Sequence, residues 1–212
     1  MRKLKLEVQI SIDGFIADAA GDMSWMIWPY TPPEWYWDKK LQQYHNDLQT
    51  SSDCILLSRN MAGGFHDFWE QAAQDPKDPR YAFAKPITEM HKVVFSQKLK
   101  ESVWKNTEIA KGDYVNFIQQ LKKKKGKDII CYGGSNFISS LIKAELIDEF
   151  HLIINPTIIG TGLPIFNAIT RKQNLRLNNV IGFDCGIAVL QYSLNSKQTP
   201  EMNRKSRLPY KL

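Results

Sequence analysis

The most informative stretch of the chain runs Ile129-Ile130-Cys131-Tyr132-Gly133-Gly134-Ser135-Asn136-Phe137. Its first half predicts a buried strand, and the spacing of apolar residues after the glycines predicts a helix. A strand that ends in glycines and leads into a helix gathers backbone N–H groups where the helix dipole favours a phosphate. Ser135 would cap this helix or donate to the phosphate. A tight turn without a ligand explains the pattern equally well, so both interpretations stay open.

The flanking segments alternate between strand and helix patterns. Leu4–Ile10 alternates apolar and polar residues, which predicts a strand with one face in the core. Short apolar runs at 54–57 and 93–95 predict buried strands, and runs at 175–181 and 187–192 lack a helix between them. Helical patterns begin at Glu34, at Asp113 (ending at Gly126) and at Ser135. The order predicts an α/β fold with a mostly parallel, mixed sheet that ends in a β-hairpin.

Composition favours one globular domain. The chain has 212 residues, 43% of them hydrophobic and 24% charged, and no apolar run is long enough to span a bilayer. The N-terminus lacks the apolar region of a signal peptide, so we expect a cytoplasmic protein without a membrane partner. The three cysteines and four histidines are scattered without zinc spacing, and we therefore expect no metal site.

The net charge of +6 raises the question of nucleic-acid binding. Residues 196–212 hold five basic residues against Glu201 alone, so they carry +4 of this charge (five minus one). The segment lacks the regular interleaving of aromatic and basic residues found in single-strand binding proteins, since Tyr210 is its one aromatic residue. We therefore expect a domain over residues 1–195, a polar basic tail over 196–212, and no nucleic-acid partner.

Polar residues follow two of the expected strands. Ser58-Arg59-Asn60 comes after the run 54–57, and Ser96-Gln97 comes after the run 93–95. Because ligands of open α/β sheets bind at the carboxyl ends of strands, Arg59 is a candidate for the adenosine 2′-phosphate of NADPH. A surface arginine paired with a carboxylate is the alternative. Trp25 would stack on a heterocycle or nicotinamide, or else pack in the core.

Several short motifs together resemble the reductase domain family of riboflavin biosynthesis, which shares the dihydrofolate reductase fold. Ser11-Ile12-Asp13-Gly14-Phe15-Ile16-Ala17 is similar to the family signature S-L-D-G-x-I-A, and Asn155–Phe166 is similar to its P-x-x-x-G-x-G-x-P-L-F segment. Further matching motifs, in the family's order, are Asp22–Trp25, Leu56–Arg59, Lys92–Ser96 and Tyr132–Ser135. The resemblance covers residues 3–194 and implies a three-layer α/β/α dihydrofolate reductase-like fold.

The resemblance also implies a cofactor, NADPH, and residues that bind it. Ala17 and the loop to Trp25 resemble the loop that closes over the nicotinamide. The remaining matches are a 2′-phosphate clamp (Ser58, Arg59, Asn60), contacts to the adenosine half (Ser96, Gln97), a pyrophosphate turn (Gly133, Gly134, Ser135, Asn136, Phe137) and a late loop (Thr161, Gly162). The family usually has glycine where this chain has Ser58.

The resemblance predicts an NADPH-dependent oxidoreductase, most like 5-amino-6-(5-phosphoribosylamino)uracil reductase, that passes a hydride to a small nitrogen heterocycle. A pyrimidinedione and a pterin are both candidate substrates, and a homodimer is expected. The proton would come from Asp13, Glu34, Asp38 or a bound water, although Asp13 would also cap its turn. Alternatives are a pterin reductase of the dihydrofolate reductase type and a nucleotide-binding protein without turnover.

Overall fold

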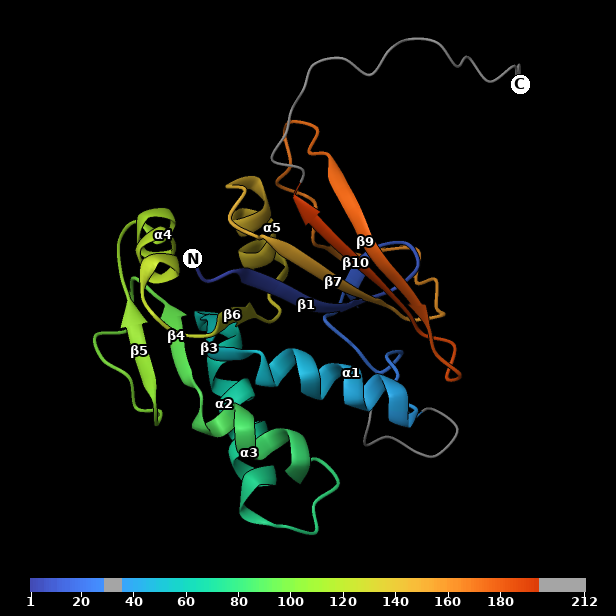
Figure 1. The fold of residues 1–212 in the computed structure, drawn as a ribbon, viewed down its shortest axis with the longest axis horizontal. Coiled ribbons are helices and arrows are strands. Elements are labelled where there is room, and N and C mark those ends of the chain that lie inside the picture. The colour runs from blue at the N-terminus through green and yellow to red at the C-terminus, as the bar shows by residue number, and fades with distance from the viewer. Residues whose placement is uncertain (29–35, 195–212) are drawn as a thin grey trace.

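The structure, a computed structural model, describes residues 1–28 and 36–194 (Figure 1). Glu34 and the expected tail 196–212 lie outside these residues. An eight-stranded sheet forms the middle layer, and its strand order is β5-β4-β3-β6-β1-β7-β10-β9. Six strands are parallel: β1 (Leu4–Ile10), β3 (Ser52–Ser58), β4 (His91–Phe95), β5 (Thr107–Ala110), β6 (Asp128–Cys131) and β7 (Glu149–Ile154).

The sheet ends in the hairpin that the sequence predicts. β10 (Ala188–Leu194) runs antiparallel to β7, and β9 (Leu175–Gly182) pairs with β10 at the edge. A separate two-stranded ribbon joins β2 (Phe15–Asp18) to β8 (Gly162–Pro164). The prediction of a mostly parallel, mixed sheet with a C-terminal β-hairpin is confirmed.

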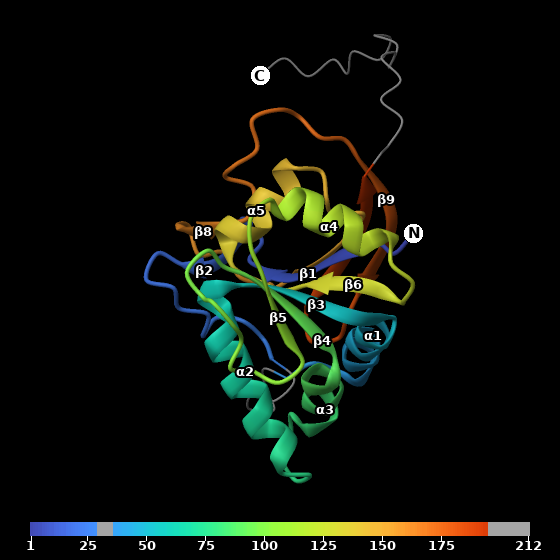
Figure 2. The ribbon, with the colours of Figure 1, turned by 90° about the vertical axis from the view of Figure 1, so that its left-hand side faces the viewer.

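Helices cover both faces of the sheet (Figure 2). One face carries α1 (Lys39–Thr50), α2 (Arg59–Gln74) and α3 (Tyr81–Glu89); the other carries α4 (Tyr114–Lys123) and α5 (Ser135–Lys143). The apolar residues divide accordingly: Ile118 and Leu141 pack in the cluster of Leu4 and Leu6, whereas Leu41 packs in a different cluster. The three-layer α/β/α architecture is therefore confirmed.

Two expected helix bounds need correction. The helix expected from Glu34 begins as α1 at Lys39, after the cap residue Asp38, and the helix expected from Asp113 ends before Gly126. The Asp113 carboxylate accepts hydrogen bonds from Val115 and Asn116 N–H, which starts α4 as predicted. However, α4 ends at Lys123, before Gly126, which instead lies in the turn into β6. A Cβ on Gly126 would meet Asp53 Oδ2 at 2.6 Å, so this glycine permits a close approach between loops.

The first strand is buried on both faces, although its alternating pattern predicted one face in the core. Leu4, Leu6, Val8 and Ile10 belong to the cluster that includes α4 and α5 residues. The intervening Lys5, Glu7 and Gln9 are also at most 9% exposed. Their side chains have polar partners, such as the Ser51 hydroxyl for Lys5 and the His45 ring for Glu7. The polar face is thus covered by α1 rather than by solvent.

Candidate functional site

The turn at Gly133 and Gly134 packs against the start of α2. Both glycines have positive φ, +27° and +88°. A Cβ on Gly133 would lie 2.8 Å from Met61 Sδ, and one on Gly134 would lie 2.8 Å from Ser58 Oγ. The missing side chains therefore let the β6–α5 turn approach the β3–α2 junction, and two segments with predicted cofactor residues become neighbours.

Two helix N-termini consequently meet at the carboxyl edge of the sheet. α5 begins after Gly134 and α2 after Ser58, and neither N-cap residue makes a side-chain hydrogen bond to its helix. The first N–H groups of a helix have no partner within it, and the dipole makes this end favourable for an anion. Arg59 and Asn60, in the first turn of α2, are exposed. Within the described chain, the Arg59 guanidinium has no hydrogen-bond or ion-pair partner.

The other predicted contacts near this turn are partly engaged by the protein itself. The Ser135 hydroxyl donates to the Pro164 carbonyl oxygen at 2.5 Å rather than capping α5. Asn136 is exposed, and the Phe137 ring lies 5.6 Å from that of Phe95. At the end of β4, Ser96 is buried and accepts hydrogen bonds from the two N–H groups that follow Gln97, which is itself exposed.

The β2–β8 ribbon also reaches this edge, because Pro164 of β8 accepts the hydrogen bond from Ser135 at the start of α5. A Cβ on Gly162 would lie 2.2 Å from the Ala17 carbonyl oxygen, so the ribbon is in close contact. Ala17 is buried, whereas Thr161 is exposed. Trp25 is half-buried and donates through Nε1 to the Asp22 carbonyl oxygen at 3.3 Å. Exposed apolar side chains of this region are Ile12, Met23, Ile158, Leu163 and Phe166.

The predicted acids are held by hydrogen bonds. The Asp13 carboxylate accepts from Ser11 Oγ at 2.6 Å and from Gly160 N–H at 2.7 Å; the hydroxyl, with the backbone donors, holds the pKa of this carboxyl below its ordinary value. Asp38 caps α1 by accepting from Leu41 N–H at 2.9 Å. Burial alone would raise the pKa of the Asp38 carboxyl, but hydrogen bonds from backbone N–H groups outweigh burial and hold it below its ordinary value. Both acids are therefore held ionised, and Glu34 lies outside the described residues.

A buried polar layer lies beneath this edge, and the sequence interpretation missed it. Glu7 on β1 contacts His45 on α1, whose other ring nitrogen lies 2.6 Å from Gln49 Nε2. Tyr132, which precedes the glycine turn, directs its hydroxyl into the interior, and burial raises its pKa well above the ordinary value. Polar residues at alternate positions of β1 and on the inner side of α1 were the available signal.

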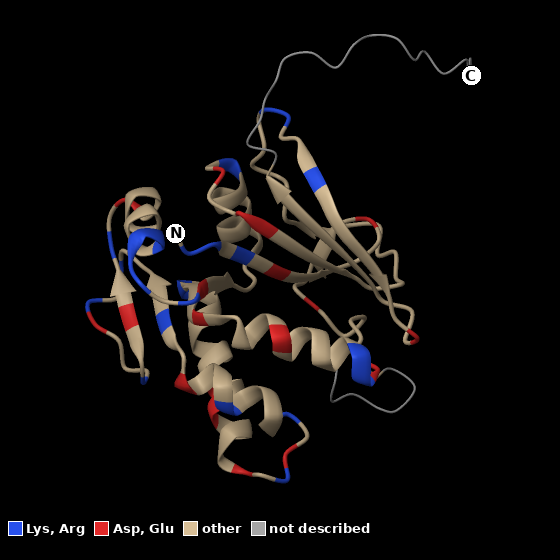
Figure 3. Ribbon diagram, in the orientation of Figure 1, with Lys and Arg blue, Asp and Glu red and all other residues tan. Residues whose placement is uncertain are grey.

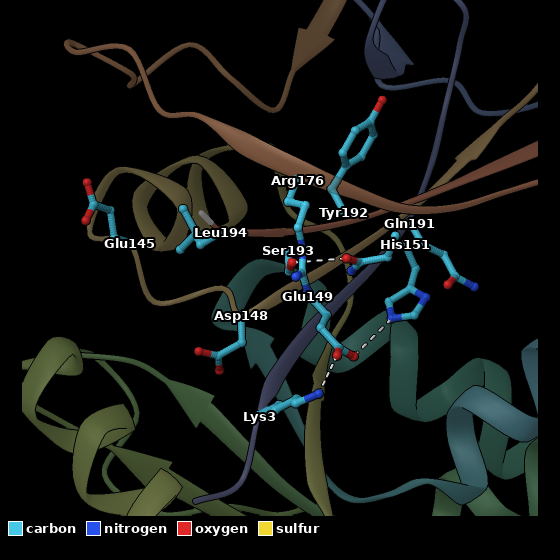
Figure 4. A pocket seen from close by; sticks show the side chains of 11 residues that line it. Lys3, Glu145, Asp148, Glu149, His151, Arg176, Gln191, Tyr192, Ser193 and Leu194 are labelled. Carbon is cyan, nitrogen blue, oxygen red and sulfur yellow. Dashed lines mark hydrogen bonds and ion pairs between the residues drawn. The ribbon is translucent and has the colours of Figure 1, made fainter. Parts of the chain in front are cut away.

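The opposite edge of the sheet is hollowed (Figure 4). The hollow measures about 790 Å³ and is lined by residues of β7, β9 and β10, by Glu145 and Asp148 between α5 and β7, and by Lys3, which precedes β1. Lys3 Nζ lies 2.6 Å from Glu149, and His151 Nε2 lies 3.7 Å from the same carboxylate. The nearby His151 ring and the Lys3 ammonium group lower the pKa of Glu149 to about 2. None of the predicted site residues lines this hollow.

The described residues contain no cluster of three or more His, Cys, Asp or Glu side chains able to hold a metal ion. None of the described helices is long and apolar enough to cross a membrane. Lys and Arg are spread over separate elements, including the start of α1 and the segment after α4 (Figure 3).

Comparisons with known proteins match nearly the whole chain. The uncharacterized proteins YyaP and YwjB of Bacillus subtilis (strain 168) are 29% and 23% identical over 196 and 190 residues. These matches cover 92% and 86% of this chain and 96% and 92% of the relatives. A putative riboflavin biosynthesis protein from Shewanella sp. PV-4 has a similar fold, with TM-score 0.69, 20% identity, and coverage of 92% of this chain and 99% of its own.

A second solved structure is a diaminohydroxyphosphoribosylaminopyrimidine deaminase/5-amino-6-(5-phosphoribosylamino)uracil reductase from Thermotoga maritima. It gives TM-score 0.64 and 16% identity, and the match covers 91% of this chain but 56% of that longer one. The model of the family described as RibD C-terminal domain matches residues 2–189. The chain therefore belongs to the RibD C-terminal domain family.

Proposed function

We propose that this protein is an NADPH-dependent oxidoreductase that transfers a hydride to a small nitrogen heterocycle, and that it is most like 5-amino-6-(5-phosphoribosylamino)uracil reductase. The observation that carries the proposal is the close approach of the Gly133–Gly134 turn to Ser58, which joins two uncapped helix N-termini at one edge of the sheet. Phosphate groups bind favourably at such termini. The exposed Arg59 beside them adds the positive charge that a 2′-phosphate requires.

The residues present fit this dinucleotide. In the proposal, the turn 133–137 holds the pyrophosphate and Ser58, Arg59 and Asn60 hold the 2′-phosphate. Ser96 and Gln97 border the adenosine half, and Ala17, Trp25, Thr161 and Gly162 border the nicotinamide half. The bound cofactor would supply the hydride, while the protein fixes the geometry and excludes water.

The proton source follows from the hydrogen bonds of the acids. Asp13 and Asp38 have lowered pKa values, which disfavours their acting as acids near neutral pH. The proposal therefore assigns the proton to a bound water, and Glu34 remains a prediction. A homodimer, which the family resemblance supports, and the cytoplasmic location expected above are further parts of the proposal.

Titration of tryptophan fluorescence with NADPH and NADH tests the cofactor. We expect NADPH to bind more tightly, and Arg59→Ala to weaken NADPH by about 10- to 100-fold, because a charged hydrogen-bonded pair is lost. Arg176→Ala, an exposed arginine on β9, is the matched control and should bind as the wild type. No binding of either nucleotide would overturn the assignment, and equal binding by Arg59→Ala would remove Arg59 from it.

A second candidate is a nucleotide-binding protein without turnover. Its support is that the two described acid candidates are both engaged in structural hydrogen bonds. Consumption of NADPH in the presence of pyrimidinediones and pterins separates the two candidates. Turnover with any of these heterocycles excludes the second candidate, whereas tight NADPH binding without turnover across the set favours it.

A further inference from the structure

We propose that Asp13 and Ser135 are positioning residues that together hold the segment 157–164 across the carboxyl edge of the sheet. The segment contains β8 and the predicted cofactor contacts Thr161 and Gly162. The hydrogen bonds that hold this segment are observed in the structure and do not depend on a bound cofactor. The part of the proposal that concerns NADPH rests on the proposed function.

Asp13 holds the beginning of the segment. Its Oδ2 accepts from Gly160 N–H at 2.7 Å and its Oδ1 from Ile159 N–H at 3.3 Å. Gly160 has φ +78°, a conformation that residues with side chains rarely adopt. Consecutive N–H groups that include a left-handed residue form a concave nest for an anion. Here the anion is the carboxylate of a residue 147 positions away in the sequence.

The Asp13 carboxylate is itself oriented by a hydrogen bond from Ser11. Ser11 is fully buried and donates its hydroxyl to Asp13 Oδ1 at 2.6 Å. The same Ser11 oxygen accepts from Phe15 N–H at 3.1 Å, which fixes the turn between β1 and β2. No lysine or arginine pairs with Asp13 among the described residues. The negative charge is therefore directed at the backbone of 159–160.

Ser135 holds the other end. Its hydroxyl donates to the Pro164 carbonyl oxygen at 2.5 Å, which links β8 to the first residue of α5. Between the two ends, the closeness of Gly162 to the Ala17 carbonyl oxygen leaves no space for a side chain. The segment is thus tied to the β1–β2 turn, to β2 and to the glycine turn. Loss of either side-chain contact should loosen the residues that are predicted to face the cofactor, while the β2–β8 pairing and the Ile12 N–H bond to the Thr157 carbonyl oxygen remain.

The experiment compares Asp13→Ala, Asp13→Asn and Ser135→Ala with the wild type. The control is Asp75→Ala, because Asp75 also accepts a backbone N–H within an exposed turn, from Lys77 at 2.9 Å, but follows α2. Amide hydrogen exchange of Ile159 and Gly160 reads the two hydrogen bonds directly. Thermal unfolding, NADPH binding, and kcat and KM with a heterocycle that is turned over complete the set.

In Asp13→Ala we expect both amides to exchange about 10-fold faster or more, because a charge-assisted acceptor is lost. Asp13→Asn keeps an oxygen acceptor and should restore part of the protection. NADPH binding should weaken in Asp13→Ala and Ser135→Ala, whereas Asp75→Ala should match the wild type. The midpoint of thermal unfolding should fall in Asp13→Ala, because the buried Ser11 hydroxyl also loses its acceptor.

Unchanged exchange at Ile159 and Gly160 in Asp13→Ala would overturn the tether. Faster exchange with unaltered NADPH binding, kcat and KM would overturn the positioning role. A wild-type protein that binds no NADPH would defeat the proposed function and with it the positioning role. The exchange rates would still decide whether Asp13 holds the segment, so the two failures are distinguishable.

Discussion

Replacement of Gly134 by alanine tests the packing that brings the two helix N-termini together. Gly134 has φ +88°, and a left-handed conformation costs an L-residue about 1–2 kcal/mol. The new Cβ would also lie 2.8 Å from Ser58 Oγ and 3.4 Å from Ser58 Cβ. Overpacking of this kind costs about 1–3 kcal/mol. We therefore expect Gly134→Ala to lower the free energy of unfolding by about 2–5 kcal/mol.

A matched variant separates the two contributions. Gly21 has the same φ, +88°, but no atom lies within 4 Å of the place that a Cβ would take there, so Gly21→Ala should carry only the conformational cost. The double variant Gly134→Ala/Ser58→Gly removes the contacted side chain. The double variant should regain the stability that the contact with Ser58 costs, and this gain appears as a coupling free energy of about 1 kcal/mol or more.

Urea denaturation gives the free energies of unfolding of the wild type and these variants, and Ser58→Gly alone completes the double-mutant cycle. NADPH titration shows whether the affinity for the nucleotide changes with the packing. If Gly134→Ala loses no more stability than Gly21→Ala, the turn does not press on Ser58 and the reasoning is refuted. Absence of coupling in the double variant would contradict it as well. Weaker NADPH binding in Gly134→Ala, partly restored in the double variant, would link the packing to the site.

Two further predictions concern other parts of the fold. Glu149 has its pKa lowered to about 2 from 4.5, so its contribution to stability is present above pH 4.5 and is lost as the pH falls towards 2. The difference in free energy of unfolding between the wild type and Glu149→Gln should therefore shrink as the pH falls from 4.5 towards 2. A difference that stays constant over this range would contradict the lowered pKa of Glu149. Burial raises the thiol pKa of Cys54 and of Cys131 to about 12, whereas Cys185 is half-buried. A thiol reagent should therefore modify Cys185 in the native protein and the other two only after unfolding, as mass spectrometry would show.

Much of the sheet could be predicted because its strands are short, continuous apolar runs between turn residues. β3, β4 and β6 are strands of this kind, and their parallel pairing agrees with the helices that the structure places between them. α2 and α3 escaped the prediction for physical reasons. α2 contains Gly63 and Gly64, which weaken a helical pattern, and α3 contains Pro86 within a nine-residue helix. Packing on the sheet overcomes both local penalties.

The candidate site could be predicted only where its parts are local. The glycine turn and Arg59 each follow a recognisable strand, so their place at the carboxyl edge was expected. The partners of Asp13 lie 146 and 147 positions away, and no local pattern reveals them. The sequence left two roles for the Ser135 hydroxyl, capping α5 or binding a phosphate, whereas in the structure it donates to the Pro164 carbonyl oxygen. Tertiary contacts thus set roles that residue type leaves open.

The buried polar layer under α1 specifies the register of the central strand β1, which the apolar face of this strand does not. The apolar face of β1 is uniformly aliphatic, so a shift by two residues would place similar side chains in similar positions. The other face is not uniform: Glu7 is aligned with His151 of β7, which is aligned with Gln191 of β10. A shift by two would move Glu7 away from His45 and bury an unpaired carboxylate, which is costly. The layer therefore penalises wrong registers of β1 against β7, and it helps to fix the end of β1, where the turn that holds Asp13 begins.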